Sequence, residues 1–383
     1  MKVLYLTNLP SPYMVDFFSE LAKKAELTVI YERSAASDRD EKWKNCDDSK
    51  IFNPDSYKVI LLKGIKRGTD NSVSFGIFKY LKEKYDHIII GDYATYTAMM
   101  AIRYLRKNKI PYILSTDGGF PNYEESSFKK KLKTYLIGGA SKWLCTGASS
   151  RKYLEYYGAR KEDVYIYPFT SLFAKDILKT PLTYESKQSL RKKLGLLGTK
   201  VVIGVGQFIP RKGWDVLIEG IDELNGHGNN DAFVDVDMSF DDIHYYIVGG
   251  EEEKLRMLLP KCTEIPANVH ILPFMPKEEL FQYYRAADAF VLPTREDIWG
   301  LVVNEAMANA LPVITTDKCN AGLELVKEGV NGFIIETENS EALLKALREC
   351  LKDDASSSMA EAALKTIEKY THENRAEVTL SML

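Results

Sequence analysis

The sequence predicts an α/β protein built from two Rossmann-like domains, each a doubly wound parallel sheet with helices on both faces. Short apolar runs alternate with longer helical patterns along the chain, as expected for strands that are buried on both faces. The alternation stops once near the middle and then starts again, which indicates two similar sheets in tandem. With 383 residues and 45% apolar side chains, the chain is long enough for two hydrophobic cores.

Seven apolar runs predict the strands of an N-terminal domain over residues 1–168. They lie at 2–7, 27–31, 58–62, 87–91, 112–115, 143–146 and 165–167. Residues 169–183 follow neither the helical nor the strand period clearly, and we expect the linker there. Thr183 can then cap a helix, and six further runs predict the strands of a C-terminal domain over residues 184–365. These runs lie at 200–205, 245–248, 269–272, 289–292, 312–315 and 332–335.

The composition argues against several other classes of protein. No segment approaches the roughly 18 uncharged apolar residues of a membrane span, and the first residues resemble a strand more than a signal peptide, so we expect a cytoplasmic protein. Five scattered cysteines without a C-x-x-C pair argue against a disulfide framework or a structural zinc site. Several aspartates stand between Asn225 and Asp242, but without the order of an EF-hand loop, so we expect a surface loop there.

Charge is divided unevenly between the two halves. Residues 1–168 hold 28 Lys and Arg against 20 Asp and Glu, a balance of +8. The chain totals of 51 and 54 leave 23 against 34 for the remainder, a balance of −11. A basic N-terminal half would attract an anionic acceptor or an anionic membrane surface. Ordinary surface charge that happens to be unevenly divided is the alternative.

The most informative segment is 294–314, which reads T-R-E-D-I-W-G-L-V-V-N-E-A-M-A-N-A-L-P-V-I. It starts at the carboxyl end of one predicted strand, crosses a loop with Gly300 and runs down a helix to the next strand. Open parallel sheets bind ligands in such loops, and the amino end of the helix favours an anion. Asp297 and Glu305 stand eight positions apart, and a carboxylate at each end suits a ligand whose hydroxyls flank a diphosphate.

A second motif, residues 204–218, reads G-V-G-Q-F-I-P-R-K-G-W-D-V-L-I. Gly204 and Gly206 alone are a weak dinucleotide-binding signal, because the third glycine of the Rossmann fingerprint is missing. Arg211 and Lys212 lie in the loop before the next helix. Two fixed cations there can neutralise the charge that develops on a leaving nucleoside diphosphate. A solvated surface pair is the alternative.

These two motifs resemble those of family 4 retaining glycosyltransferases, which have the GT-B fold of two facing Rossmann-like domains. The stretch W-G-L-V-V-N-E-A-M-A matches the family's E-x7-E signature almost throughout, and the Arg-Lys-Gly motif is shared as well. The resemblance implies that Asp297 meets the hydroxyls of the donor sugar and that Glu305 holds the ribose diol. It also implies that the amides of Gly300 and Leu301, with Val302 beside them, meet the sugar and the phosphates.

The sequence departs from the family pattern at the first carboxylate. The family usually has Glu where Asp297 stands, so the side chain is one methylene shorter. Glu296 could substitute for it. Weaker signals are Gly249, which ends a predicted strand in a glycine turn beside the site, and Phe274, in a loop that resembles the family's base-reading loop. Phe274 could equally pack in the core.

The N-terminal domain is expected to bind the acceptor. Pro12 and Tyr13 follow the first strand and so line its crevice, although the glycine pair of many relatives is absent. Asp117, Gly118 and Gly119 follow another strand, without the histidine that is common there in relatives. Asp117 is the candidate acceptor-contacting group or base. A carboxylate that fixes a glycine turn is the alternative.

Residues 128–137 predict a helix with a cationic side and an apolar side. Its lysines are Lys129, Lys130, Lys131 and Lys133, and its apolar residues include Phe128, Leu132, Tyr135 and Leu136. Such a helix can lie on an inner-membrane surface, as expected for a lipid-linked acceptor. A core-packed helix with a solvated lysine face explains the pattern as well.

The motifs and the resemblance together predict a retaining glycosyltransferase that uses a nucleoside diphosphate sugar, with uridine as the expected base. The expected acceptor is a hydroxyl of a glycan or of a polyprenyl-linked sugar, and we expect no nucleic acid partner. We expect no cofactor and no metal, since fixed cations would replace a divalent ion. The family fold also implies that the final helix, 366–383, packs back on the N-terminal domain. An epimerase or phosphorylase of the same fold, and a non-catalytic nucleotide-binding partner subunit, remain as alternatives.

Overall fold

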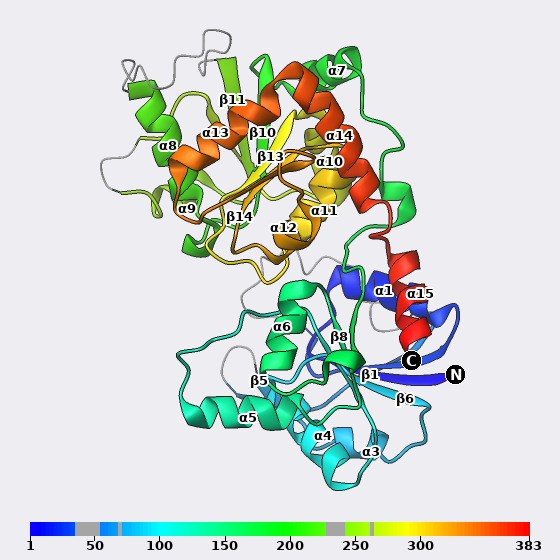
Figure 1. The fold of residues 1–383 in the computed structure, drawn as a ribbon. Coiled ribbons are helices and arrows are strands. Elements are labelled where there is room, and N and C mark those ends of the chain that lie inside the picture. The colour runs from blue at the N-terminus through cyan, green and yellow to red at the C-terminus, as the bar shows by residue number, and fades with distance from the viewer. Residues whose placement is uncertain (35–53, 68–70, 227–241, 261–263) are drawn as a thin grey trace. The chain divides into compact units, whose positions relative to one another are not determined.

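The computed structural model describes residues 1–34, 54–67, 71–226, 242–260 and 264–383 (Figure 1). The chain divides into two compact units. The first unit contains Met1–Phe173 and Tyr370–Leu383, and the second contains Ala174–Lys369. The division at residues 173 and 174 falls inside the segment 169–183 that the sequence marks as a linker.

The first unit is a seven-stranded parallel sheet in the order β3-β2-β1-β6-β7-β8-β9. Its strands are β1 Lys2–Thr7, β2 Glu26–Tyr31, β3 Lys58–Leu61, β6 His87–Ile90, β7 Ile113–Thr116, β8 Lys142–Cys145 and β9 Val164–Ile166. Its helices are α1 Pro12–Ala22, α3 Ile77–Tyr80, α4 Tyr96–Lys107, α5 Ser127–Ile137, α6 Ala148–Tyr156 and α15 His372–Met382. Every predicted strand of this half is present, with ends displaced by at most one residue.

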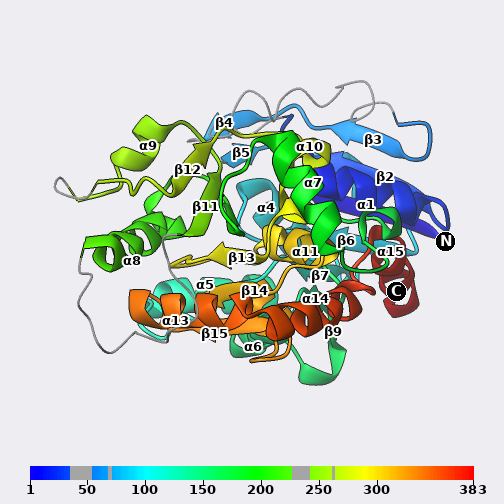
Figure 2. The same cartoon turned by 90° about the horizontal axis from the view of Figure 1, so that it is seen from above.

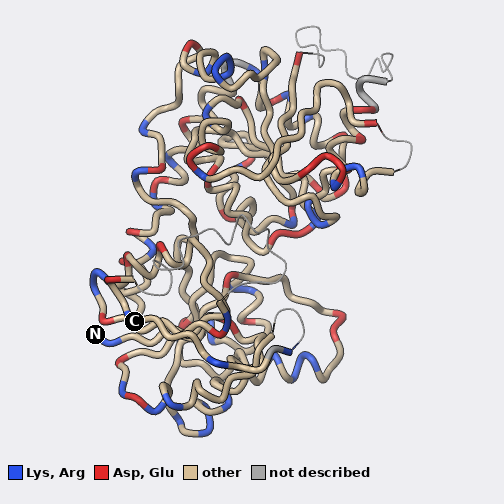
Figure 3. The backbone as a smooth tube through the Cα atoms, turned by 180° about the vertical axis from the view of Figure 1, so that it is seen from behind, with Lys and Arg blue, Asp and Glu red and all other residues tan. Residues whose placement is uncertain are grey.

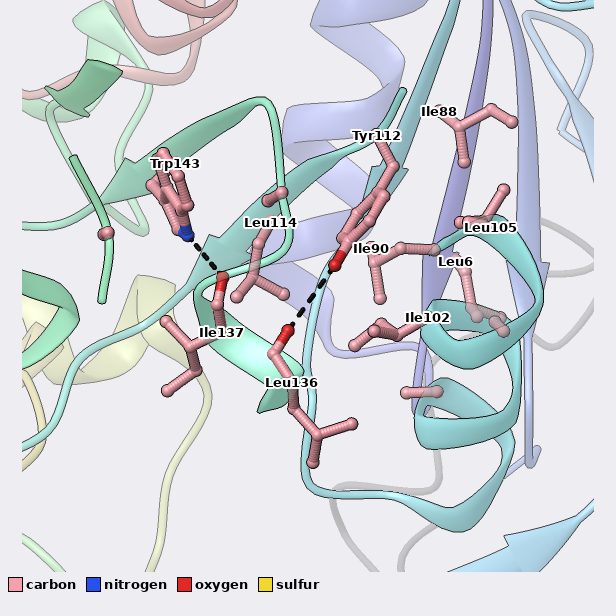
Figure 4. Packing of buried hydrophobic residues seen from close by; sticks show 14 of the residues in the cluster. Leu6, Ile88, Ile90, Ile102, Leu105, Tyr112, Leu114, Leu136, Ile137 and Trp143 are labelled. Atoms are coloured by element: carbon pink, nitrogen blue, oxygen red, sulfur yellow. Dashed lines mark hydrogen bonds between the residues drawn. The ribbon is translucent and has the colours of Figure 1, made fainter. Parts of the chain in front are cut away.

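Alternate residues of the central strands form the hydrophobic core on one face of this sheet. Leu6, Ile90 and Leu114 point from neighbouring strands toward α4, which contributes Ile102 and Leu105 (Figure 4). Two buried aromatic residues of this core also donate hydrogen bonds to main-chain carbonyls. The indole of Trp143 donates to the carbonyl of Ile137 at 2.8 Å, and the hydroxyl of Tyr112 donates to the carbonyl of Leu136 at 3.5 Å. These bonds tie the end of α5 to the core, because a buried donor without a partner is costly.

The second unit repeats the plan with a six-stranded parallel sheet in the order β12-β11-β10-β13-β14-β15. Its strands are β10 Lys200–Val205, β11 Ile243–Val248, β12 Val269–Leu272, β13 Ala289–Leu292, β14 Val313–Thr316 and β15 Gly332–Ile335. Its α-helices are α7 Tyr184–Leu194, α8 Trp214–Gly226, α9 Glu252–Arg256, α10 Lys277–Ala286, α11 Leu301–Ala308, α12 Asn320–Leu325, α13 Ser340–Leu351 and α14 Asp353–Ile367, with the 3-10 turn η4 Pro210–Lys212. Helix α10 packs against α7, α13 packs against α8, and α14 packs against both α11 and α13 (Figure 2).

The second half of the chain begins with a capped helix, α7, and ends with two helices, α14 and α15. Thr183 caps α7, since its side chain accepts from the amide of Ser186. The final helix, expected over residues 366–383, is α15, which begins at His372 and belongs to the first unit, whereas α14 ends at Ile367 in the second unit. Helix α15 packs against α1, and Lys24 pairs with Glu377 across that contact at 2.6 Å.

A small antiparallel hairpin was not predicted. It consists of β4 Ile65–Arg67 and β5 Asn71–Val73. The strands are three residues each and carry lysine, arginine and asparagine, so neither period appears in the sequence. A tertiary contact holds the second strand, because the hydroxyl of Thr97 on α4 donates to the carbonyl of Ser72 at 2.9 Å.

Candidate functional site

The residues predicted for the C-terminal half gather at the carboxyl edge of the second sheet. Strand order runs outward from β10 through β11 to β12 on one side and through β13 to β15 on the other. The chain therefore reverses direction of travel between β10 and β13, and open α/β sheets bind ligands at such a switch point. The loops after Val205 and Leu292, which carry the two sequence motifs, both end there.

Two glycine turns bring backbone close to this edge. Gly206 donates to the carbonyl of Val248 at 2.9 Å, and Gly249 donates to the carbonyl of Leu272 at 3.1 Å. A Cβ on Gly249 would lie 1.9 Å from the carbonyl oxygen of Gly206, so only glycine fits. The absence of both side chains leaves main chain exposed to a ligand that approaches the strand ends.

Lys212 and Asp297 form a buried ion pair across the switch point. The ammonium Nζ of Lys212 lies 2.5 Å from Oδ2 of Asp297, and the two side chains are 10% and 13% exposed. Arg211 places Nη1 3.8 Å from the other carboxylate oxygen and is 42% exposed. The pair therefore joins the first carboxylate of one motif to the cations of the other. Arg211 remains accessible to an anionic ligand.

The structure distinguishes between the two neighbouring acids. Glu296 is exposed, and its contribution to the site is its main-chain carbonyl, which accepts from Nη1 of Arg211 at 2.6 Å. Asp297 is buried, and the loop fixes its backbone: its amide donates to the carbonyl of Lys318 at 2.8 Å. Asp297 is thus the carboxylate that lies beside Lys212, although its side chain is the shorter of the two.

Helix α11 presents its amino end at the same edge. Gly300 is the residue before the helix, with φ +98°, and no side chain caps the helix. A Cβ there would lie 2.9 Å from Sγ of Cys319, which explains the glycine. The first amides of a helix, here including Leu301 and Val302, lack intrahelical partners and face a positive dipole end. This arrangement can hold a phosphate or a sugar hydroxyl.

Glu305 lies one turn into α11 and is half-buried. The phenol of Tyr284 on α10 lies beside it: burial first, and then the charge of Glu305, raises the pKa of Tyr284 well above its usual range. Phe274, in the loop after β12, is also half-buried. Both residues are therefore partly exposed to solvent.

The acceptor-side residues gather in the first unit. Pro12 is the first residue of α1, and the ring of Tyr13 lies 5.4 Å from that of Phe169. The hydroxyl of Tyr13 bonds to the carboxylate of Asp117, whose main-chain carbonyl accepts from the hydroxyl of Thr146 at 3.0 Å. Asp117 keeps an exposed edge while protein crowds its carboxyl group. This desolvation raises the pKa of Asp117 to about 6, against the opposing charge of Arg375.

Glycines shape the loop after Asp117. Gly118 has φ +132°, and a Cβ on Gly119 would lie 3.1 Å from the ring of Tyr153. The hydroxyls of Tyr153 and Tyr93 are bonded to each other beneath this loop. The loop thus lies directly on a tyrosine pair at the carboxyl edge of the first sheet.

The lysine helix is α5, and its exposed face is apolar. Phe128, Leu132 and Tyr135 are 78%, 40% and 43% exposed, and they recur at the helical spacing of one stripe. Lys129 and Lys131 are exposed, and the helical spacing places them on either side of that stripe. Figure 3 shows the basic positions of the chain as blue segments of the tube. Lys130 and Lys133 are engaged differently: Lys130 bonds the hydroxyl of Tyr156 at 2.8 Å, and Lys133 pairs with Glu125 at 3.0 Å. The alternative, a helix whose apolar side packs in the core, therefore holds for Leu136 and Ile137 but not for this stripe.

Other sequence features carry no site in the described part of the chain. The aspartate-rich stretch lies almost wholly outside the described residues. Cys145, Cys319 and Cys350 are buried free thiols. Within the described ranges, no group of three or more metal-ligating side chains is found, and no helix has the length and apolarity to cross a bilayer.

The sequence motifs missed the residues that connect the two loops. The hydroxyl of Thr294 donates to the carbonyl of Arg211 at 2.9 Å, and the guanidinium of Arg295 bonds Asp215 through both of its Nη atoms. Each of these residues lies within three positions of a predicted site residue in the sequence. The available signal was an arginine and an aspartate inside the two motifs. Nothing in the sequence showed that they pair.

Comparison with known proteins relates the second unit to one family. Residues 186–367 match the family described as "Glycosyl transferases group 1". The D-inositol 3-phosphate glycosyltransferase of Corynebacterium urealyticum is 32% identical over 208 residues, which are 52% of this chain and 46% of that protein. The GDP-mannose-dependent monoacylated alpha-(1-6)-phosphatidylinositol monomannoside mannosyltransferase of Corynebacterium glutamicum is 32% identical over 184 residues, 45% of this chain and 44% of that protein. The chain thus spans a little under half the length of these curated relatives.

A solved structure extends the likeness to the whole fold. Anabaena Alr3699/HepE in complex with UDP-glucose is similar over 100% of both chains, with a TM-score of 0.71 and 18% identity. At that identity the comparison concerns the fold. It confirms the predicted GT-B architecture of two Rossmann-like domains.

Proposed function

We propose that this chain, whose residues 186–367 match the glycosyl transferases group 1 family, is a retaining glycosyltransferase. In this proposal it moves a sugar from a nucleoside diphosphate sugar to a hydroxyl of a glycan or lipid-linked glycan. The observation that carries the proposal is the buried contact of Lys212 with Asp297, 2.5 Å long, at the switch point of the second sheet. Arg211 lies on one side of it and the uncapped amino end of α11 lies close to it in the loop.

These groups fit the parts of a nucleotide sugar. A diphosphate needs fixed cations and free amides, which Arg211, Lys212 and the first turn of α11 supply. Sugar and ribose hydroxyls need acceptors, which Asp297 and Glu305 supply as carboxylates. The glycines at 206 and 249 leave room for the ligand to approach the strand ends.

The proposed reaction breaks the bond between the anomeric carbon and the diphosphate oxygen. The electron pair leaves with the diphosphate, and Arg211 and Lys212 stabilise the charge that develops there. The acceptor oxygen bonds to the anomeric carbon from the same face, which retains the configuration, and its proton passes to the departing phosphate. No protein nucleophile takes part. The two fixed cations do the work of a divalent ion, so the proposal includes no metal or other cofactor.

Glu305→Gln tests the donor site. The amide keeps the shape but accepts more weakly from a ribose diol, so we expect the dissociation constant of the donor to rise about 10-fold, the cost of roughly 1.4 kcal/mol. Isothermal titration calorimetry with the donor nucleotide measures this dissociation constant. Glu349→Gln is the control, since Glu349 pairs with Lys352 on the exposed surface of α13. Unchanged affinity in the Glu305 variant would place the nucleotide elsewhere.

We propose uridine as the base. Support comes from the structural neighbour that was crystallised with UDP-glucose, whereas the mannosyltransferase relative uses GDP-mannose. A thermal-shift screen with UDP-, GDP- and ADP-sugars decides between these bases, because a ligand at 100 times its dissociation constant stabilises the fold by about 2.7 kcal/mol. Product analysis then separates transfer from epimerisation and phosphorolysis, since only transfer yields a new glycosidic bond to the acceptor.

We further propose that α5 brings the chain to the cytoplasmic membrane surface, where a lipid-linked acceptor would be found. The exposed stripe of Phe128, Leu132 and Tyr135 supports this, and Lys129 and Lys131 flank it as cations that can reach anionic headgroups. We expect binding to phosphatidylglycerol vesicles and weaker binding to phosphatidylcholine vesicles in sedimentation. Phe128→Ser with Leu132→Ser should abolish binding. Met257→Ser should not, although Met257 is 77% exposed in the second unit.

A further inference from the structure

Arg295 connects the two loops that carry the charged groups of the site. Its guanidinium bonds Asp215 twice, with Nη1 2.9 Å from Oδ1 and Nη2 2.7 Å from Oδ2. Nη1 also donates to the carbonyl of Pro210 at 2.6 Å. Asp215 is in the first turn of α8, and Pro210 begins the η4 turn that contains Arg211 and Lys212. The side chain of Arg295 therefore bonds to both ends of the short segment that contains Arg211 and Lys212.

The main chain reinforces the same connection. The amide of Arg295 donates to the carbonyl of Arg211 at 2.8 Å, and the buried hydroxyl of Thr294 donates to that carbonyl at 2.9 Å. Between the two, Gly213 has φ +67°, and a Cβ there would lie 2.0 Å from the carbonyl oxygen of Pro293. The loops thus touch at a point where no side chain fits. Their relative position depends on the few bonds that surround this contact.

We propose that Arg295, with Asp215, is a positioning residue for the reacting site: it fixes the η4 turn so that Lys212 and Arg211 stay aligned with Asp297. The inference rests on the proposed function, because the alignment matters only if these cations meet the leaving diphosphate. Arg295 itself contacts neither Lys212 nor Asp297 through its guanidinium. The planar guanidinium suits this role, because it donates to both carboxylate oxygens of Asp215 and to the carbonyl of Pro210 at the same time.

Arg295 has a third partner, Glu338, whose exposure can be compared with that of Asp215. Glu338 also bonds Arg295 through both carboxylate oxygens, Oε1 with Nε and Oε2 with Nη2 at 2.9 Å, but its side chain is 52% exposed. Asp215 is 20% exposed. Exposed ion pairs are worth little, so we assign the alignment to the bonds with Asp215 and Pro210. Glu338 adds a tie to the loop after β15.

Arg295→Met and Asp215→Asn test the proposal. Since a misplacement of about 1 Å can cost about 100-fold, we expect each to lower kcat by about 10- to 100-fold. The KM for the donor should rise less, because the misaligned cations act mainly on charge that develops in the transition state. The double variant should be no worse than the poorer single variant, because the two residues act as one unit. Arg295→Lys should recover part of kcat, since it restores one bond of the fork.

Lys187→Met is the matched control for lost stability. Lys187 pairs with Asp288 at 3.4 Å with 18% and 13% exposure, at the amino end of β13 and thus the opposite edge of the same sheet. It should lower Tm about as much as Arg295→Met while kcat stays unchanged. Should Arg295→Met keep kcat within twofold while Lys212→Met is inactive, the positioning role is refuted and the proposed function stands. Should Lys212→Met be fully active as well, the proposed site itself is wrong.

Discussion

Replacement of Lys212 by methionine separates the structural role of the Lys212–Asp297 pair from its chemical role. Both side chains are almost enclosed, at 10% and 13% exposure, and the contact is 2.5 Å. Methionine fills a similar volume but leaves the Asp297 carboxylate buried without its ammonium partner. Removing one member of a buried pair costs about 3–5 kcal/mol. Arg211 remains 3.8 Å from the other carboxylate oxygen, so we expect the lower end of that range.

A cost of about 3 kcal/mol corresponds to a fall in Tm of about 6–12 °C, at about 2–4 °C per kcal/mol for a unit of this size. Scanning calorimetry of the variant measures it. Adding Asp297→Asn removes the orphaned charge while keeping the shape. The double variant should regain most of the lost Tm, because a buried neutral amide is far less costly than an unpaired carboxylate.

Turnover should behave in the opposite way. Without the ammonium of Lys212, the leaving diphosphate loses a preorganised cation, and we expect kcat to fall about 100-fold or more. Asp297→Asn cannot restore that charge, so the double variant should be stable and still slow. Recovery of turnover together with Tm would show that Lys212 serves only to neutralise Asp297. A Tm within 2 °C of the wild type in the single variant would show that the pair is not buried in solution.

Two further predictions follow from buried groups. Burial raises the pKa of Glu32 from 4.5 to about 7, so between these pH values the folded protein keeps a proton that the unfolded chain has lost. The free energy of unfolding should therefore fall by about 3 kcal/mol as pH rises through this window. Glu32→Gln should abolish that fall in thermal melts from pH 5 to pH 8. Gly249→Ala places a Cβ 1.9 Å from the carbonyl oxygen of Gly206, so the turn must move to accommodate it. We expect the free energy of unfolding, measured by calorimetry, to fall by about 1–3 kcal/mol, and nucleotide binding to weaken. Wild-type values for both would show that the turn moves without cost.

The sequence predicts most of the fold because parallel strands buried on both faces are nearly continuous apolar runs. For example, residues 87–91 and 289–292 lie within one residue of β6 and β13. The hairpin of β4 and β5 escapes this reasoning, because its strands are short and polar and a contact with Thr97 holds one of them. The break between α14 and α15, at residues 368–371, also depends on packing, which the periodicity of the sequence does not show.

The candidate site was predictable residue by residue but not as an arrangement. Glycines and charged residues after the ends of β10 and β13 mark the edge, since the carboxyl ends of parallel strands meet there. The partner of Asp297 is 85 positions away, and only the sheet order brings β10 beside β13. The pairing of Arg295 with Asp215 depends on the same neighbourhood. Sequence separation of this kind hides a contact even when both residues lie beside recognised motifs.

Net charge is a poor guide to what each half binds, because single strand ends can carry charges of the opposite sign. The N-terminal half has a balance of +8, yet acids stand one or two positions after three of its strands: Glu32 after β2, Asp92 after β6 and Asp117 after β7. The C-terminal half has a balance of −11, yet Arg211 and Lys212 lie at its switch point. Carboxylates accept from hydroxyls and repel phosphate, whereas fixed cations attract phosphate. The local charges therefore support placing a hydroxyl acceptor at the first sheet and a diphosphate at the second, against the sign of each half taken as a whole.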